Sequence, residues 1–139
     1  MTFVPTARFV DVIANHPSVR PYIQGGNYRL YSAPVVENPA NVVLANGTGV
    51  VIFEGLSGGL YEGHIMCLEG HRGVEALELV AQGLQAVFRR PTASIVVAFA
   101  PLVLPAVGVL CRRAGFQSEG RDLFHERFAH NGESLWAVS

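Results

Sequence analysis

The sequence predicts a mixed α/β protein in which helices pack on a central sheet. Residues 60–68 show a period of two, which is typical of a strand, and residues 74–88 place apolar side chains three and four positions apart, which is typical of an amphipathic helix. The 139 residues contain no internal repeat, low-complexity tract or linker. We therefore expect a single domain over residues 1–139.

The composition limits the classes of partner. The formal net charge is −1, so no overall field attracts nucleic acid or a membrane surface. The apolar segment 95–111 contains Pro101 and Pro105, which favours a strand and a buried helix over a membrane span. Cys67 and Cys111 lie inside predicted elements and the N-terminus lacks a signal-peptide pattern, which indicates a reduced, cytoplasmic protein. With 50% hydrophobic residues, we expect some apolar surface reserved for a partner.

Periodicity and turn residues predict the other elements along the chain. Before the strand we expect a helix at 5–14 capped by Thr2 or Thr6, a helical turn within 16–26 ending at Gly25 and Gly26, an irregular segment at 27–39 with some strand character at 28–31, and a hairpin of 42–45 and 49–54 around Asn46-Gly47. After the long helix we expect a strand at 94–100, a helix at 102–114 ended by Gly115, an extended stretch at 116–119 leading into 122–128, and a second hairpin through Asn131-Gly132 to 134–138.

The strand and the long helix each have two predicted sides. On the strand, one side carries Leu60, Glu62, His64, Met66 and Leu68, and the other carries Tyr61, Gly63, Ile65 and Cys67. On the helix, the predicted buried stripe consists of Val74, Leu77, Val80, Ala81, Leu84, Val87 and Phe88.

The turn between these two elements is a candidate anion site. It reads Glu69-Gly70-His71-Arg72-Gly73, and its glycines let the backbone turn tightly and approach a ligand. The helix that follows presents unpaired N–H groups and the positive end of its dipole. Such helix starts bind phosphate and other anions.

The order of the elements and two local sequences resemble the GNAT family, the Gcn5-related N-acetyltransferases. The first is YEGHIMCLEGHRGVEALELVAQGLQAVF at 61–88, which is similar to the central strand and the acetyl-CoA-binding helix of the family, and the second is AVGVLCRRAGFQSEGR at 106–121. The resemblance covers residues 42–138 and looks closest to small acetyltransferase-like proteins of tailed phages, some of which have head-assembly or other virion roles. It implies a mostly antiparallel, twisted sheet flanked by helices.

The resemblance also implies a place for acetyl-CoA. The family binds the pyrophosphate with the backbone of an R/Q-x-x-G-x-G/A loop, which begins here at Arg72 and Gly73, with Glu75 and Leu77 at the later small-residue positions. A splayed strand that exposes its backbone to pantetheine corresponds to 65–68. The cofactor residues implied are Ile65, Met66, Cys67, Leu68, Gly70, His71, Arg72 and Gly73; His71 and Arg72 also fit a loop histidine and a surface arginine.

Acetylation of an amine needs a base for the ammonium proton and donors for the developing oxyanion. Glu62 and His64 share one side of the strand next to the expected acyl site, so they are the catalytic candidates; equally, they pair with one another or with the next strand. Glu54 is a weaker candidate. The later helix has Leu104 where the family often has Asn and contains no Tyr, and Cys111 fits a buried apolar role, so the general acid is unassigned.

Two functions follow as hypotheses. One is an acetyl-CoA-dependent N-acetyltransferase that acts on an unknown amine. The alternative is a non-catalytic virion or head-assembly protein, located in the virion, with copies of itself or other virion proteins as partners. Glu75, Leu77 and the missing Asn and Tyr motivate this alternative. The histidines show no metal-ligand spacing, so no metal is expected.

Overall fold

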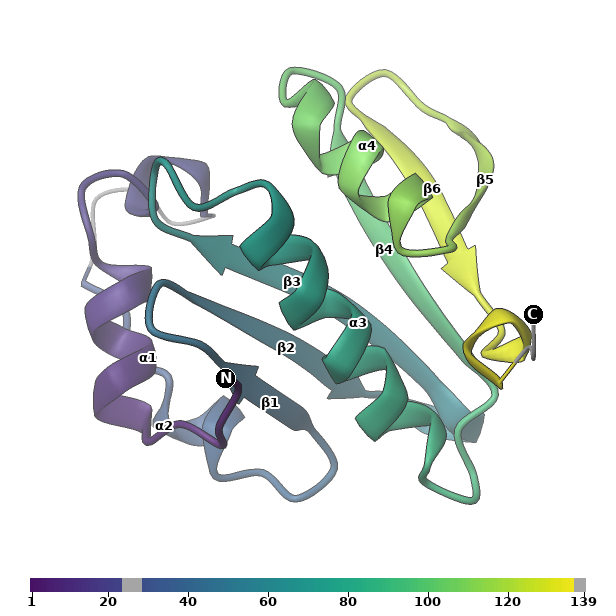
Figure 1. The fold of residues 1–139 in the computed structure, drawn as a ribbon, viewed down its shortest axis with the longest axis horizontal. Coiled ribbons are helices and arrows are strands. Elements are labelled where there is room, and N and C mark those ends of the chain that lie inside the picture. Colours follow the sequence, from purple (N-terminus) through teal and green to yellow (C-terminus); the bar gives the residue numbers. More distant parts are fainter. Residues whose placement is uncertain (24–28, 137–139) are drawn as a thin grey trace.

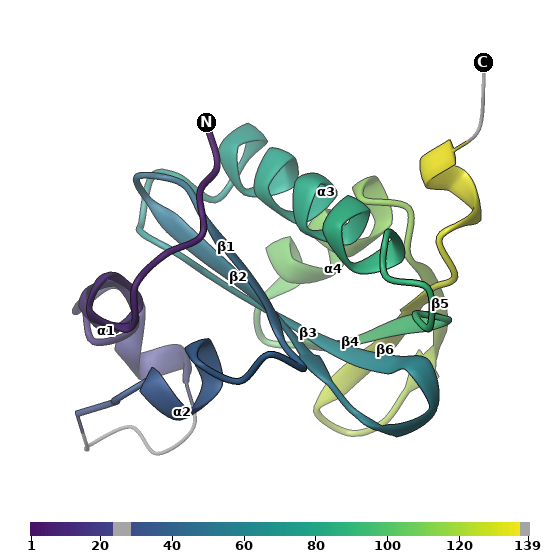
Figure 2. The same ribbon diagram turned by 90° about the horizontal axis from the view of Figure 1, so that it is seen from below.

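A computed structural model describes residues 1–23 and 29–136, and these form a six-stranded sheet with helices on both faces (Figure 1, Figure 2). The elements are α1 Ala7–Ala14, η1 Arg20–Tyr22, α2 Ala33–Val36, β1 Val42–Ala45, β2 Gly49–Gly55, η2 Ser57–Gly59, β3 Leu60–Cys67, α3 Val74–Phe88, β4 Ile95–Pro101, α4 Pro105–Arg113, β5 Gln117–Arg121, β6 His125–His130 and η3 Glu133–Trp136.

The sheet has the strand order β1-β2-β3-β4-β6-β5. All neighbouring strands are antiparallel except β3 and β4, which α3 connects as a parallel pair. The prediction of a mostly antiparallel sheet flanked by helices is therefore confirmed. No helix among the described residues has the length and apolar character needed to cross a bilayer.

Helices α1 and α2 cover one face of the sheet on the β1 side, and α3 and α4 lie on the opposite face (Figure 2). The larger core lies between α3, α4 and the sheet and includes Phe53, Leu79, Leu84 and Phe128, all almost fully buried. A smaller core lies under α1. Its buried members are Val10, Ile13, Val43, Ala45, Val50 and Ile52.

Helix α3 has the predicted bounds, but its buried face differs from the predicted one. Val74 is 69% exposed and Leu77 is half-buried. Gly83 sets the rotation of the helix, because a Cβ there would lie 2.5 Å from Cε2 of Phe53. The buried positions are Ala76, Leu79, Val80, Gly83, Leu84 and Val87.

The N-terminal predictions were partly correct. Thr6 caps α1 by accepting the N–H of Phe9 at 3.2 Å, and η1 is the predicted helical turn. Gly25, Gly26 and Tyr28 lie outside the described residues. The segment expected to be irregular contains the short helix α2, and residues 29–31 form no strand. A proline in the first turn of α2 explains its start, because proline is well suited to that position.

The predicted strand at 134–138 was wrong where the structure describes it. Residues after β6 form η3, because the Asn131 side chain accepts the N–H of Glu133 at 3.1 Å and Gly132 turns the chain with a φ of 84°. A hairpin forms one strand earlier, between β5 and β6, where the Asp122 carboxylate accepts two backbone N–H groups. Helix α4 begins at Pro105, later than predicted, and Gly115 ends it with a φ of 95°.

Candidate functional site

The parallel strands β3 and β4 pair over only three positions. The last pair joins Glu62 to Val97, and beyond it the two strands separate (Figure 1). The C=O of Leu60 and the N–H of Leu68 both bond toward β2, to Leu56 and Thr48. Since peptide groups alternate in direction along a strand, those of Ile65 point toward β4 beyond the last pair, where the ladder has ended. The opening is therefore lined by main-chain donors and acceptors.

Helix α3 begins beside this opening. Gly70 has a φ of 85°, which only glycine adopts readily, and Gly73 is the N-cap residue. In the part of the chain that the structure describes, no side chain caps the helix start. The first N–H groups of α3 and its positive dipole end are thus available to an anionic ligand.

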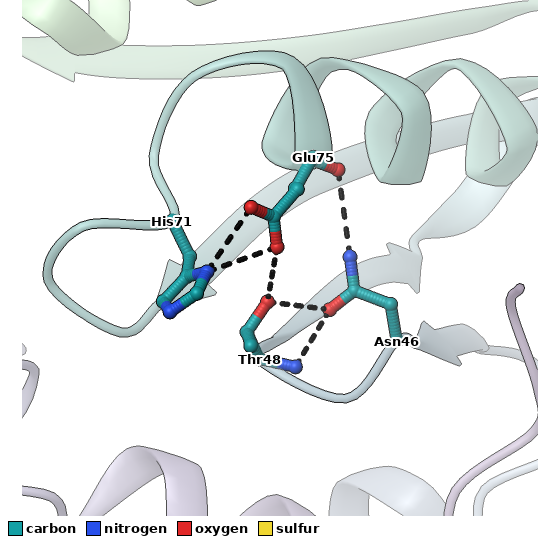
Figure 3. A network of polar contacts seen from close by, with 4 residues as sticks. All are labelled: Asn46, Thr48, His71 and Glu75. Atoms are coloured by element: carbon teal, nitrogen blue, oxygen red, sulfur yellow. Dashed lines mark hydrogen bonds and ion pairs between the residues drawn. The ribbon is translucent and has the colours of Figure 1, made fainter.

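Glu75, in the first turn of α3, belongs to a polar network with the β1–β2 turn (Figure 3). Its carboxylate oxygens lie 3.0 and 3.1 Å from Nδ1 of His71, and the Thr48 hydroxyl donates to Oε2 at 3.1 Å. The Asn46 side chain donates to the main-chain oxygen of Glu75 at 3.4 Å. The carboxylate is thereby held between the His71 ring and the Thr48 hydroxyl.

Arg72 is already bound to the protein at several points. Its Nε donates to the C=O of Cys67 at 3.0 Å, and its Nη2 donates to the C=O of Ser18 at 2.6 Å. The guanidinium carbon also lies 5.7 Å from the centre of the Tyr22 ring. The Arg72 side chain therefore holds the turn to the end of β3 and to Ser18.

The remaining predicted cofactor residues differ in orientation. Ile65 and Cys67 direct their peptide groups to the β4 side, although the C=O of Cys67 is bonded to Arg72. Met66 and Leu68 pack their side chains against the core under α1, and the N–H of Leu68 is bonded to Thr48. The structure thus separates the four residues into two that face the opening and two that support the strand.

The predicted catalytic pair lies on the face of the sheet that α1 covers, at the point where β3 and β4 separate. His64 Nε2 is 2.9 Å from Glu62 Oε2 and 3.4 Å from Oε1 of Glu54 on β2. The side chains are partly exposed, at 45%, 32% and 43% respectively. The pairing of His64 with Glu62 and with the neighbouring strand, one of the two expected alternatives, is present. The catalytic role of Glu62 and His64 stays a prediction.

The two cysteines are unsuited to nucleophilic chemistry. Burial raises the pKa of Cys67 and of Cys111 to about 11, and this outweighs the lowering by Arg72 and by Arg112. Both thiols are therefore protonated near neutral pH. Within residues 1–23 and 29–136, no group of three His, Cys, Asp or Glu side chains could hold a metal ion.

A separate hollow of about 610 Å³ lies at the far end of the sheet. It is lined by residues of β5, β6 and η3, among them Glu119, His130 and Glu133. None of the predicted site residues contributes to it.

Sequence reasoning did not find Thr48, Asn46, Ser18 or Tyr22. Thr48 lies 27 positions from Glu75, and Ser18 lies 54 positions from Arg72. The only local signal was the Asn-Gly turn, which places Asn46 and Thr48 at a hairpin end. Their contacts with the start of α3 depend on the pairing of β2 with β3.

A parallel strand pair that separates within an antiparallel sheet, with a helix start at the open end, is the architecture of the GNAT fold. Solved structures with this fold include the spermidine N-acetyltransferase of Vibrio cholerae in complex with CoA and spermine, at a TM-score of 0.76 and 15% identity over 99% of this chain and 98% of that one. A chimera of the same enzyme with hSSAT has a TM-score of 0.72 and 15% identity over 97% and 96%. Neither a protein-family model nor a curated protein matches the sequence.

At this level of identity the likeness establishes the fold. The predicted GNAT-like architecture is confirmed by these neighbours. They lend no support to the resemblance to phage proteins or to the virion or head-assembly role.

Proposed function

We propose that this protein is an acetyl-CoA-dependent N-acetyltransferase. The observation that carries the proposal is the early end of β3–β4 pairing after Glu62 and Val97, beside an uncapped start of α3. In this fold, one neighbour was solved with CoA and spermine. The acyl carrier is expected to lie in the opening, with its pyrophosphate at the start of α3.

The proposed cofactor contacts are mainly to the main chain. The peptide groups of Ile65 and Cys67 face the carrier, and the turn from Gly70 to Gly73, including His71 and Arg72, receives the pyrophosphate. Met66 and Leu68 hold β3 in place through the core under α1. Backbone recognition explains why the departures from small residues at Glu75 and Leu77 are compatible with binding, since Glu75 is held by His71 and Thr48.

Acetyl-CoA supplies the acetyl group as a thioester: the amine nitrogen forms the amide C–N bond, the C–S bond breaks, and CoA leaves as a thiolate that takes up a proton from the attacking nitrogen or from solvent. Glu62 accepts the proton of the acceptor ammonium, directly or through a water molecule, so that a neutral amine can attack. His64, 2.9 Å away, orients the Glu62 carboxylate. The peptide N–H of Ile65 points toward the opening and is the proposed donor to the carbonyl oxygen on which charge develops.

The proposed acceptor is a cationic primary amine. Glu54 and Glu62 place two carboxylates on one partly exposed surface, next to His64, and such a surface attracts a positive charge. Because the neighbours are spermidine N-acetyltransferases, spermidine and spermine are the first amines to test.

The test has a binding part and a catalytic part. Saturation with acetyl-CoA at about 100 times the dissociation constant should raise the free energy of unfolding by about 2.7 kcal/mol, measured by thermal or urea unfolding. Release of the CoA thiol in the presence of each amine then measures transfer. If millimolar acetyl-CoA leaves the unfolding transition unchanged, the proposed function is wrong.

A further inference from the structure

The turn between β3 and α3 is joined to the segment that follows α1. The N–H of Glu69 donates to Oγ of Ser18 at 3.2 Å, and Nη2 of Arg72 donates to the C=O of Ser18 at 2.6 Å. The Arg72 guanidinium also stacks over the ring of Tyr22 at 5.7 Å. Figure 1 shows this segment beside the turn between β3 and α3.

One guanidinium therefore connects three parts of the molecule. Its Nε holds the C=O of Cys67, the last residue of β3, while its Nη2 holds Ser18, and its own main chain belongs to the turn. A planar guanidinium with donors in a fixed fork can make these contacts and stack on an aromatic ring together, which a lysine ammonium cannot do.

The joined segment lies on the side of the proposed acceptor. Met66 and Leu68 of β3 pack against the core under α1, and they share their side of the strand with Glu62 and His64. Residues 16–22 follow α1 directly, and Val19 within them is 4% exposed. The turn proposed to hold pyrophosphate is thus tied to the segment that follows α1, and α1 covers the face of the sheet that carries Glu62.

We propose that Arg72 is a positioning residue that couples acetyl-CoA binding at the turn to the ordering of residues 16–23. The inference rests on the proposed function, because it needs acetyl-CoA at the start of α3. When the turn is restrained by a bound pyrophosphate, Arg72 transmits the restraint to Ser18 and Tyr22. Coupling of this kind is reciprocal, so ordering of the segment by an amine also strengthens acetyl-CoA binding.

Amide hydrogen exchange measures this coupling without a known amine. The reporters are the N–H groups of Val19, Arg20, Tyr22 and Ile23, each bonded to a carbonyl within the segment. In the wild type, saturating CoA should slow their exchange at least about fivefold, the lower end of ordinary coupling between sites. Arg72→Gln and Arg72→Lys should both lose this slowing.

The lysine variant separates coupling from charge, because it keeps the positive charge for phosphate but lacks the fork. Arg113→Gln, an exposed arginine at the end of α4, is the matched control and should slow exchange as the wild type does. If CoA binds but exchange in the segment is unchanged or faster, or if the slowing persists in both Arg72 variants, the coupling is wrong and the proposed function stands. If CoA does not bind to the wild type, both are wrong.

Discussion

The contacts of Glu75 with His71 and Thr48 lead to a prediction about cofactor affinity. Release of the Glu75 carboxylate by the double substitution Thr48→Val and His71→Asn should weaken CoA binding. The contacts to be removed are the 3.1 Å hydrogen bond from the Thr48 hydroxyl and the 3.0 Å contact to Nδ1 of His71. The Glu75 side chain is about half exposed at 53%, so each contact is worth about 0.2–1 kcal/mol and both must be removed together.

The expected loss follows from Coulomb's law. A carboxylate in the first helical turn that moves to about 6 Å from a diphosphate with two charges adds at most about 1.4 kcal/mol of repulsion at the dielectric constant of water. That energy corresponds to at most about a tenfold rise in the dissociation constant. Salt should reduce the effect, because charges at this separation are partly screened.

Isothermal titration with CoA checks this prediction. Adding Glu75→Gln to the double variant should restore affinity, because the repelling charge is gone. Adding Glu78→Gln, an exposed carboxylate farther along α3, should not. An unchanged dissociation constant in the double variant, or a failure of Glu75→Gln to restore it, would refute the argument; the second result would mean that His71 contacts the phosphate itself.

Three further predictions concern catalysis, packing and pH. Glu62→Gln should lower kcat by about a hundredfold or more and leave the acetyl-CoA dissociation constant unchanged, because it removes the general base. An equal loss of kcat in Glu54→Gln would contradict the assignment of Glu62. Gly83→Ala should lower the free energy of unfolding by about 1–3 kcal/mol in urea, because the new Cβ would meet the Phe53 ring, although alanine normally stabilises a helix. A more stable variant would show that α3 can shift away from Phe53 at little cost. Burial of His130 lowers its pKa, and its Nδ1 accepts the N–H of Gly132. The unfolded chain therefore takes up a proton first as pH falls below about 6.5, so stability should be full above that pH and decline below it; a flat profile in the wild type, or an equal decline in His130→Phe, would count against this origin.

Local patterns in the sequence were sufficient for the elements with strong periodicity. The bounds of α3, the two sides of β3 and the first hairpin were predicted correctly, because each depends on residues close in the chain. The buried side of α3 was not, because Gly83 packs on Phe53, which lies 30 positions earlier on another element. The final segment was wrong because the Asn131 side chain bonds to Glu133 and starts a helical turn where a hairpin was expected.

In the candidate site, too, the features that depend on neighbouring residues in the chain were predictable, and those that depend on distant residues were not. The shared side of Glu62 and His64 follows from strand alternation, and the structure shows that Glu54, the weaker candidate, contacts His64 from the neighbouring strand. The consequence of Glu75 could not be judged from the sequence, because its partner Thr48 becomes a neighbour only when β2 pairs with β3. Likewise, the engagement of Arg72 by Ser18 requires the whole N-terminal segment to return to the turn.

The most direct test of the central claim is the location of bound CoA, measured by chemical-shift changes of backbone amides in the isotope-labelled protein. Titration should shift the N–H signals of Ile65 and the first residues of α3 most strongly, because these groups face the opening or begin the helix. Shifts confined to the hollow around His130 and Glu133, or none at millimolar CoA, would contradict binding between β3 and β4.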